Sequence, residues 1–405
     1  MTENDYGIEV LETPADIDAP AWNSLLAAQP DANPFMRHEY LAALHASGSA
    51  TPDTGWTPRF LTLWSSPGAR DQRPAPGRTL LGACALYLKD HSYGEYVFDH
   101  AWAHAYQQHG LRYYPKALIA PPFTPVPGAR LLARDAATRV ALARAVIDWC
   151  TQTRRSSLHI LFASDADLQA CEAAGMMVRH NVQFHWQAPP GGLRDFDDFL
   201  ASLSQDKRKK IRQERRKVSE AGVVFRHARG SGISGADWDF FYRCYERTYY
   251  EHGNAPYLSR DFFHRMQRDM PENWLLFIAE RAGQPMASSL IALNDAGTAP
   301  GTGDVAYGRY WGALERVDCL HFEACYYQPL QWCIRNGFSR FEGGAQGEHK
   351  MARALLPVRT RSAHWLAHPA FADAVQQFLA REGHGIERYV GELAQRNPFK
   401  ADRSG

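Results

Sequence analysis

The sequence lacks the features that mark several classes of protein. It holds only seven cysteines in 405 residues, and no two of them form a Cys-x-x-Cys pair. An odd, scattered set argues against a disulfide framework or a zinc site and favours a reducing compartment. No stretch approaches the roughly 18 apolar residues that a membrane-spanning helix needs. The acidic start, Met1–Tyr6, lacks the basic and apolar parts of an export signal. We therefore expect a cytoplasmic protein without a membrane span.

The chain also lacks an overall excess of charge of either sign. Its 45 Lys and Arg residues balance 44 Asp and Glu residues, and 45% of the residues are apolar. This composition excludes disorder, collagen and coiled coil as the overall class. The length favours two or three domains, each able to bury its own core.

The patterns of strands and helices repeat once along the chain. In the first half we predict strands at 59–64, 80–88, 93–98, 157–162 and 181–186, and helices at 134–153 and 166–174. In the second half we predict strands at 274–279, 286–293, 305–311, 338–341 and 360–366, and a helix at 319–336 that Pro329 kinks or restarts. A Trp-Cys pair ends a helix before a short strand in both halves. We therefore expect a duplication, with domains at 1–190 and 191–405.

This order of elements is that of the GNAT acyltransferase fold. In that fold an α/β layer opens between two strands of its sheet, and an acyl donor enters there. The predicted fold class is therefore α/β, with two tandem GNAT-like domains joined by a basic helix at 204–221. Element order alone supports the fold and says little about the reaction.

The joining helix has a nearly uniform charge. Eight cations and one acid, Glu214, lie between Lys207 and Lys217. Leu203, Ile211 and Val218 form one thin apolar stripe, so a single edge is predicted to be docked. The helix is either a solvated linker or, as clustered cations suggest, a site for phosphates. The residues predicted to bind phosphate or tRNA are Lys207, Lys209, Lys210, Arg212 and Arg216.

The densest polar cluster follows the strand predicted at 338–341. Three glycines precede Glu348, His349, Lys350 and Arg353, and glycines let backbone N–H groups approach a ligand. Ligands commonly bind in loops at the ends of strands in α/β sheets. The alternative is a flexible turn with solvated charges, which this clustering makes the weaker interpretation.

Transfer of an acyl group to an amine needs a base, an oxyanion stabiliser and room for the leaving group. Glu348 or His349 is predicted to accept the amine proton, and Lys350 to stabilise the oxyanion. The predicted substrate-binding residues are Tyr307, Arg309, Trp311, Gln346 and Arg353. Strict alternation along the strand would place Tyr307, Arg309 and Trp311 on one face and Tyr310 on the other. No histidine pair has a third ligand at a recognised spacing, so no metal is expected.

Several segments together resemble one known family. These segments are 91–99 (HSYGEYVFD), 114–116 (YPK) through 121–125 (PPFTP), 209–216 (KKIRQERR), 321–328 (HFEACYYQ) and 344–350 (GAQGEHK). The chain resembles the FemAB-like predicted N-acyltransferases of the peptidoglycan biosynthesis/recognition type, over nearly its whole length. The resemblance implies two GNAT-like domains. The wider Fem group transfers amino acids from aminoacyl-tRNA to the amine of a peptidoglycan precursor. Lys350 matches a lysine that faces the reaction centre in that group, with His349 in place of an aromatic residue.

The predicted function is therefore transfer of an acyl or aminoacyl group to an amine, such as that of a cell-wall precursor. Aminoacyl-tRNA or acyl-CoA is the expected co-substrate, and no permanently bound cofactor is expected. The pyrophosphate loop of acetyl-CoA-using GNAT enzymes, Q/R-x-x-G-x-G/A, is missing between Trp311 and Leu320. Two alternatives remain open: a non-catalytic RNA-binding protein, and a module that recognises cell-wall precursors. The sequence does not fix the oligomeric state.

Overall fold

The computed structural model describes residues 6–65, 78–295, 304–345 and 347–400. It divides into two compact units, and both are discontinuous in sequence. Unit 1 contains residues 1–181 and 360–387, and unit 2 contains residues 182–359 and 388–405. The division predicted at residue 190 does not anticipate that residues 360–387 belong to the first unit.

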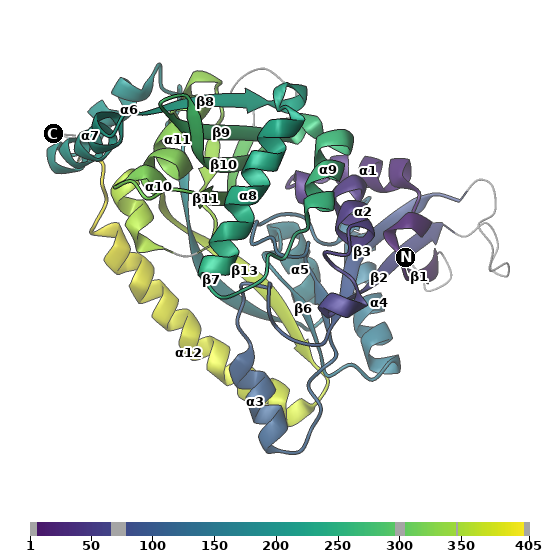
Figure 1. Cartoon of the computed structure of the whole chain (residues 1–405). Coiled ribbons are helices and arrows are strands. Elements are labelled where there is room, and N and C mark those ends of the chain that lie inside the picture. Colours follow the sequence, from purple (N-terminus) through teal and green to yellow (C-terminus); the bar gives the residue numbers. More distant parts are fainter. Residues whose placement is uncertain (1–5, 66–77, 296–303, 346, 401–405) are drawn as a thin grey trace. The chain divides into compact units, whose positions relative to one another are not determined.

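The sheet of unit 1 is built on a meander followed by a parallel pair (Figure 1). Its strands are β1 (Tyr6–Leu11), β2 (Trp56–Ser65), β3 (Leu80–Lys89), β4 (Lys116–Ile119), β6 (Ser157–Ile160) and the end of β13 (Leu356–Leu366), in that order. β5 (Leu132–Ala133) pairs with β3. β4 and β6 are parallel, while the other neighbours along this order are antiparallel.

Helices of unit 1 supply the apolar residues that cover this sheet. They are α1 (Ala19–Ala27), α2 (His38–Ala46), α3 (His100–Gln108), α4 (Ala136–Gln152), α5 (Asp165–Ala173) and the first part of α12 (Pro369–Ala394). Helix α4 begins where the Asp135 side chain accepts a hydrogen bond from the backbone N–H of Thr138. Its Leu142 and Val146 pack in one buried cluster with Ile119 and Ile160 of the parallel pair.

Unit 2 repeats this arrangement. Its order is β8 (Val223–Arg229), β9 (Trp274–Arg281), β10 (Gln284–Asn294), β11 (Val305–Ala313), β12 (Arg340–Glu342) and the end of β7 (Met177–Gln187). β11 and β12 are the parallel pair, and β7 is antiparallel to β12. The succession of antiparallel and parallel pairs is the same in both units. This confirms the α/β class with two tandem GNAT-like domains.

In each unit the last strand comes from the other half of the chain. The end of β13 completes the sheet of unit 1, and the end of β7 completes that of unit 2. The helices of unit 2 are α6 (Phe196–Ser202), α7 (Gln205–Glu220), α8 (Gly235–Glu251), α9 (Arg260–Asp269), α10 (Leu320–Phe322), α11 (Gln328–Arg335) and the end of α12. α7 is the predicted basic helix, and its Ile211 and Val218 are buried as expected.

Two predicted elements differ from the structure. The segment 93–98 is a loop, because Gly94 and Tyr96 adopt φ values of +80° and +65°, which no strand allows. The helix predicted at 319–336 is interrupted by a π-helical stretch, Glu323–Tyr327, after which Pro329 lies in the first turn of α11. Of the two alternatives predicted at Pro329, a kink or a restart, the new helix that begins at Gln328 agrees with a restart.

Candidate active site

The candidate site lies in unit 2, where β11 and β12 separate. The two strands pair over three residues only, from Val305 opposite Arg340 to Tyr307 opposite Glu342. β12 then ends, while β11 continues paired with β10. The two main chains approach closely here: a Cβ on Gly308 would lie 3.4 Å from the carbonyl oxygen of Glu342. Where two parallel strands part, backbone groups lose their ladder partners and become available to a ligand.

A β-bulge at this point changes which side chains share a face. Between Gly308 and Tyr310 the strand holds one extra residue, Arg309, with none opposite it on β10. One extra residue shifts the alternation by one position. Tyr307 and Tyr310 therefore share a face, and Trp311 points to the other. The alternation predicted from the sequence is wrong here, because it assumed a regular strand.

Side-chain contacts agree with the bulge. The Arg309 guanidinium lies 5.0 Å from the ring centre of Tyr310 and donates a 3.2 Å hydrogen bond to its hydroxyl. Tyr310 also packs against Tyr245 of α8, with ring centres 5.2 Å apart. On the opposite face, the ring of Trp311 lies 5.5 Å from that of His321. The predicted substrate-binding residues of β11 thus do not share one face of the sheet: Tyr307 and Trp311 lie on opposite faces.

Lys350 lies inside the loop that follows β12. Its side chain is 3% exposed, and its amine donates hydrogen bonds to the carbonyl oxygens of Gly344 and Ala345, both at 3.0 Å. The chain makes room for it at Gly343, where a Cβ would meet the Lys350 Cδ at 3.3 Å. Burial lowers the pKa of Lys350 to about 8.

The two predicted bases, Glu348 and His349, have different surroundings. Glu348 is exposed, accepts a 2.8 Å hydrogen bond from the Tyr389 hydroxyl and pairs with Arg396 at 3.1 Å. His349 is also exposed, and its Nε2 lies 3.2 Å from the Tyr326 hydroxyl. Burial and the nearby cations of Arg353 and Lys350 lower the pKa of His349, so its ring is neutral near pH 7.

Arg353 connects this loop to the basic helix. It is buried, and its guanidinium lies 2.9 and 3.0 Å from the two carboxylate oxygens of Glu214 in α7. It also lies 3.4 Å from the ring centre of Phe322 and donates to the carbonyl oxygen of His349 at 2.7 Å. Glu214 is the one acid between Lys207 and Lys217 of α7, and here it positions the loop. The structure thus places Arg353 in a buried ion pair.

Glu342, the last residue of β12, was not singled out from the sequence. It is 3% exposed, and its Oε1 lies 3.0 Å from the Arg340 Nε. Its Oε2 has no hydrogen-bond partner among the described residues, although His185 Nε2 lies 3.8 Å away. Burial raises the pKa of Glu342 to about 7, against the opposing effect of Arg340 and Arg309. An acid at a strand end just before two glycines was the signal in the sequence.

Glu342 and Lys350 reach this point from opposite faces of the sheet. Glu342 lies opposite Tyr307 and His185 on the neighbouring strands, so these three share a face. Gly343 comes next and faces the other side, where it contacts Lys350. The separation of β11 from β12 therefore has a carboxyl group on one side and an amine on the other.

An open groove of about 640 Å³ adjoins Trp311. It is lined by α8 and by the segment 313–322 that leads into α10. Three carboxylates and two guanidinium groups border it: those of Glu251, Glu315, Asp318, Arg247 and Arg316. The groove thus has mixed charge, in keeping with the missing pyrophosphate loop.

A second groove runs along α7 and is strongly basic. It is lined by Gln205, Arg208, Lys209, Arg212, Gln213 and Arg216. Of the residues predicted to bind phosphate, Lys209, Arg212 and Arg216 share this face, while Lys207 and Lys210 do not line the groove. Arg208 joins them and was not predicted.

Other predictions bear on metals, membranes and one loop residue. Within the part of the chain that the structure describes, no group of three or more His, Cys, Asp or Glu is placed to hold a metal ion. Across these same residues, no helix is long and apolar enough to cross a membrane. Gln346, a predicted substrate ligand, lies outside the described residues.

Comparisons with known proteins connect this geometry to a family. A family model described as FemAB-like, peptidoglycan biosynthesis/recognition, matches residues 13–401. No curated protein sequence matches the chain at a significant level. A crystal structure of FemX is similar over 91% of this chain and 100% of its own, with 10% identity and a TM-score of 0.51. The structure of L-PGS from Bacillus licheniformis is similar over 92% of this chain and 99% of its own, with 10% identity and a TM-score of 0.51. At such identities these structures bear on the fold alone.

Proposed function

Because the chain belongs to the FemAB-like family of peptidoglycan biosynthesis/recognition proteins, we propose that it is an N-acyltransferase. It moves an acyl or aminoacyl group from an activated donor to an amine. One observation carries the proposal: a buried carboxyl with a pKa of about 7 and a buried amine with a pKa of about 8 lie on opposite faces of the sheet at the point where β12 ends beside β11. Strongly shifted groups at an opening in a sheet are typical of active sites.

The two groups have distinct roles in the proposed reaction. The neutral acceptor amine attacks the carbonyl carbon of the donor, and a C–N bond forms while the carbonyl electrons move to oxygen. Lys350, as an ammonium ion, stabilises that oxyanion. Glu342, as a carboxylate, accepts the proton that the amine loses. The oxyanion then collapses and the bond to the donor breaks. The proton held by Glu342 passes to the leaving oxygen or sulfur, so the donor leaves as a tRNA hydroxyl or a CoA thiol and Glu342 is again a carboxylate.

The donor is proposed to be held through phosphates by α7. Arg208, Lys209, Arg212 and Arg216 border one groove without an acidic side chain in its lining. Such a face suits the polyanionic backbone of a tRNA better than a single pyrophosphate. Aminoacyl-tRNA is therefore the preferred donor, and acyl-CoA the alternative. The acceptor is proposed to be the amine of a cell-wall precursor.

Transfer can be tested with labelled aminoacyl-tRNA, or with labelled acetyl-CoA, and a muramyl pentapeptide that carries a free side-chain amine. We expect Lys350→Met and Glu342→Gln each to lower the rate by about 100-fold or more. Glu12→Gln, which changes an exposed carboxylate of unit 1, is the control and should leave the rate unchanged.

The same assay separates the three possible bases. If Glu348→Gln or His349→Gln lowers the rate strongly while Glu342→Gln lowers it little, the residue whose replacement lowers the rate strongly is the base. Rates near wild type for all of these variants, with circular dichroism showing an intact fold, would overturn the proposal. A precursor-recognition module would then explain the family membership better.

A further inference from the structure

A buried ion pair in unit 2 joins α7 to the candidate loop, and the proposed reaction does not yet use it. Arg353 is 2% exposed and Glu214 is 8% exposed. Each carboxylate oxygen of Glu214 accepts a hydrogen bond from the Arg353 guanidinium, and Oε2 also accepts one from the Tyr327 hydroxyl. Both oxygens of this carboxylate are therefore satisfied inside the protein. A fully satisfied buried network of this kind is rigid.

Tyr327 belongs to an irregular part of unit 2, the π-helical stretch Glu323–Tyr327. Turns of π-helix are rare overall and occur frequently at functional sites. The residue before it, Tyr326, has its hydroxyl 3.2 Å from His349 Nε2. The irregular turn thus contacts α7 through one tyrosine and the candidate loop through the other.

Arg353 holds one particular peptide group of the loop. Its guanidinium donates to the carbonyl oxygen of His349 at 2.7 Å. That carbonyl belongs to the planar peptide group whose N–H is the N–H of Lys350, and this N–H donates to the carbonyl oxygen of Gly347 at 3.1 Å. Both polar atoms of the peptide group before Lys350 are thus fixed. The orientation of this group sets the direction in which the Lys350 side chain leaves the main chain.

Stability of the fold does not account for this ion pair. Replacing a buried ion pair with apolar residues of similar size is often neutral or stabilising. The Arg353 Nε adds to the cost, because it is buried and has no hydrogen-bond partner among the described residues. The ring of Phe322, centred 3.4 Å from the guanidinium carbon, offers an apolar side chain a surface to pack on.

We propose that Glu214, Arg353 and Tyr327 position Lys350 for the transfer. Arg353 fixes the peptide group before Lys350, Glu214 fixes the guanidinium, and Tyr327 fixes Glu214. All three act through Lys350, so they are positioning residues. This role rests on the proposed function, because Lys350 is the group that stabilises the oxyanion. The hold on Lys350 can nevertheless be measured without any transfer.

The pKa of Lys350 reports how firmly its amine is held inside the protein. Burial lowers this pKa to about 8, and an amine released into water returns toward its ordinary value of about 10.4. NMR of the full chain labelled with ¹³C at lysine Cε can follow it, because the chain has only eight lysines and Lys350→Arg identifies the signal. We expect Arg353→Met to raise the pKa of Lys350 by about 1 or more.

A double variant separates positioning from stability. Glu214→Met with Arg353→Met replaces the pair with apolar side chains and should recover most of the melting temperature lost in Arg353→Met. It cannot donate to the carbonyl oxygen of His349, so the pKa of Lys350 should stay raised. Transfer by this variant should show a kcat lowered by about tenfold or more, with the KM for the donor within about twofold of wild type.

The matched control is Arg215→Met, which breaks the other ion pair between α7 and the π-helical stretch. Arg215 lies 2.9 Å from a carboxylate oxygen of Glu323, and this pair does not include the loop. The variant loses a partly buried ion pair as Arg353→Met loses a buried one. We expect both the pKa of Lys350 and kcat to remain as in the wild type.

A Lys350 pKa that stays at the wild-type value in both Met variants would overturn the proposal. So would a double variant in which the pKa and the melting temperature return to wild type together, because the pair would then only stabilise the fold. If the double variant does not fold, Arg353→Lys decides. Its ammonium group keeps the charge but lacks the planar fork that holds Glu214 and the His349 carbonyl together, so an unchanged Lys350 pKa there would also overturn the proposal. If the pKa moves as expected while the wild type transfers nothing, the proposed reaction fails and the hold on Lys350 stands.

Discussion

At the scale of single residues, unit 2 contains two ionisable groups that an apolar core would not retain. Lys350 and Glu342 are each 3% exposed, and burial moves their pKa values toward one another. An isolated buried charge costs several kcal/mol. A neutral side chain of similar size would avoid this cost at either position. We infer that Lys350 and Glu342 are kept because they take part in the function of the protein.

These two pKa values set the pH dependence of the proposed reaction. The rate should rise as Glu342 loses its proton near pH 7 and fall as Lys350 loses its proton near pH 8. The expected profile of kcat/KM is a narrow bell with its maximum between these values. Lys350→Arg keeps the positive charge at high pH, so the alkaline limb should disappear in that variant. A profile that stays flat from pH 6 to 9 in the wild type would contradict both roles.

The buried Glu342 should also lower stability above neutral pH. Its folded-state pKa is raised, so the protonated form favours the folded state below about pH 4, and this benefit is lost as pH rises through about 7. Glu342→Gln removes the charge and should increase the free energy of unfolding at pH 8 by roughly 1–3 kcal/mol. At pH 4 the same substitution should have little effect. Urea unfolding at both pH values tests this, and a variant less stable than wild type at pH 8 would contradict it.

At the scale of elements, α7 has two faces with separate roles. Its buried face carries Ile211, Val218 and Glu214, and Glu214 holds Arg353 of the candidate active-site loop. Its solvent face carries the basic groove. A donor bound in that groove is therefore linked through one helix to the loop that contains Lys350.

The groove predicts a salt dependence of tRNA binding. Replacing Arg208, Lys209, Arg212 and Arg216 with Gln should reduce the slope of log K against log salt by about 3, at roughly 0.7–0.9 per phosphate contact. Lys210→Gln with Lys217→Gln, which lie outside the groove, is the matched control and should change the slope much less. Fluorescence titration at several salt concentrations measures both slopes. If the slope changes equally in the two variants, α7 is a solvated linker and the groove does not bind phosphates.

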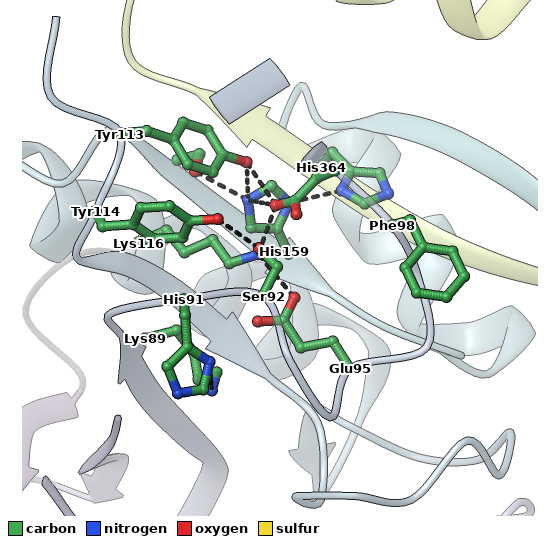
Figure 2. Close-up of polar contacts among 12 residues, drawn as sticks. Lys89, His91, Ser92, Glu95, Phe98, Tyr113, Tyr114, Lys116, His159 and His364 are labelled. Atoms are coloured by element: carbon green, nitrogen blue, oxygen red, sulfur yellow. Dashed lines mark hydrogen bonds and ion pairs between the residues drawn. The ribbon is translucent and has the colours of Figure 1, made fainter. Parts of the chain in front are cut away.

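The regular elements were largely predictable, and the irregular ones were not. Strands 80–88 and 305–311 and helix 134–153 match β3, β11 and α4 within two residues at each end. The bulge at Arg309 could not be predicted from the sequence, because it depends on how β10 pairs with β11. The loop at 93–98 was mistaken for a strand, because its aromatic residues are typical of strands. Residues distant in sequence hold it as a loop, among them Lys116, which donates to Glu95 (Figure 2), and Arg179, which donates to the carbonyl oxygen of Phe98.

The sequence singled out the candidate loop from its glycines and charges, yet the roles proposed within it depend on burial. The sequence placed Lys350 correctly in the loop after a strand. It could not show that Glu348 is exposed while Glu342 is buried, since both are acids beside glycines. Burial raises the pKa of Glu342, and this burial depends on residues distant in sequence, such as His185 opposite it on β7.

At the scale of the whole molecule, the two units are completed by each other's halves of the chain. Residues 363–366 of β13 pair with β6, and Leu366, Val375 and Leu379 share a buried cluster with Trp102 of unit 1. A fragment of residues 1–190 lacks all of these contacts. It would leave the edge of β6 unpaired and apolar.

We therefore expect the fragment 1–190 to be unable to fold alone. Circular dichroism should show little cooperative melting, and the fragment should aggregate at micromolar concentration. A fusion of residues 6–181 to residues 360–387 through a flexible Gly/Ser linker should recover a cooperative transition, because it restores unit 1. A fragment 1–190 that melts as sharply as this fusion would contradict the division into discontinuous units.

The late position of β13 has a consequence for synthesis on the ribosome. The strand that completes unit 1 is translated only after residues 182–359, which lie between it and the rest of that unit. At about 5–20 residues per second, the nascent unit waits roughly 10–35 s with its sheet incomplete. During that interval the edge of β6 is open to pairing with another nascent chain. Unit 1 therefore cannot complete its fold before the second half of the chain has been translated. The yield in cells should depend on chaperones that protect the first half until the second has emerged.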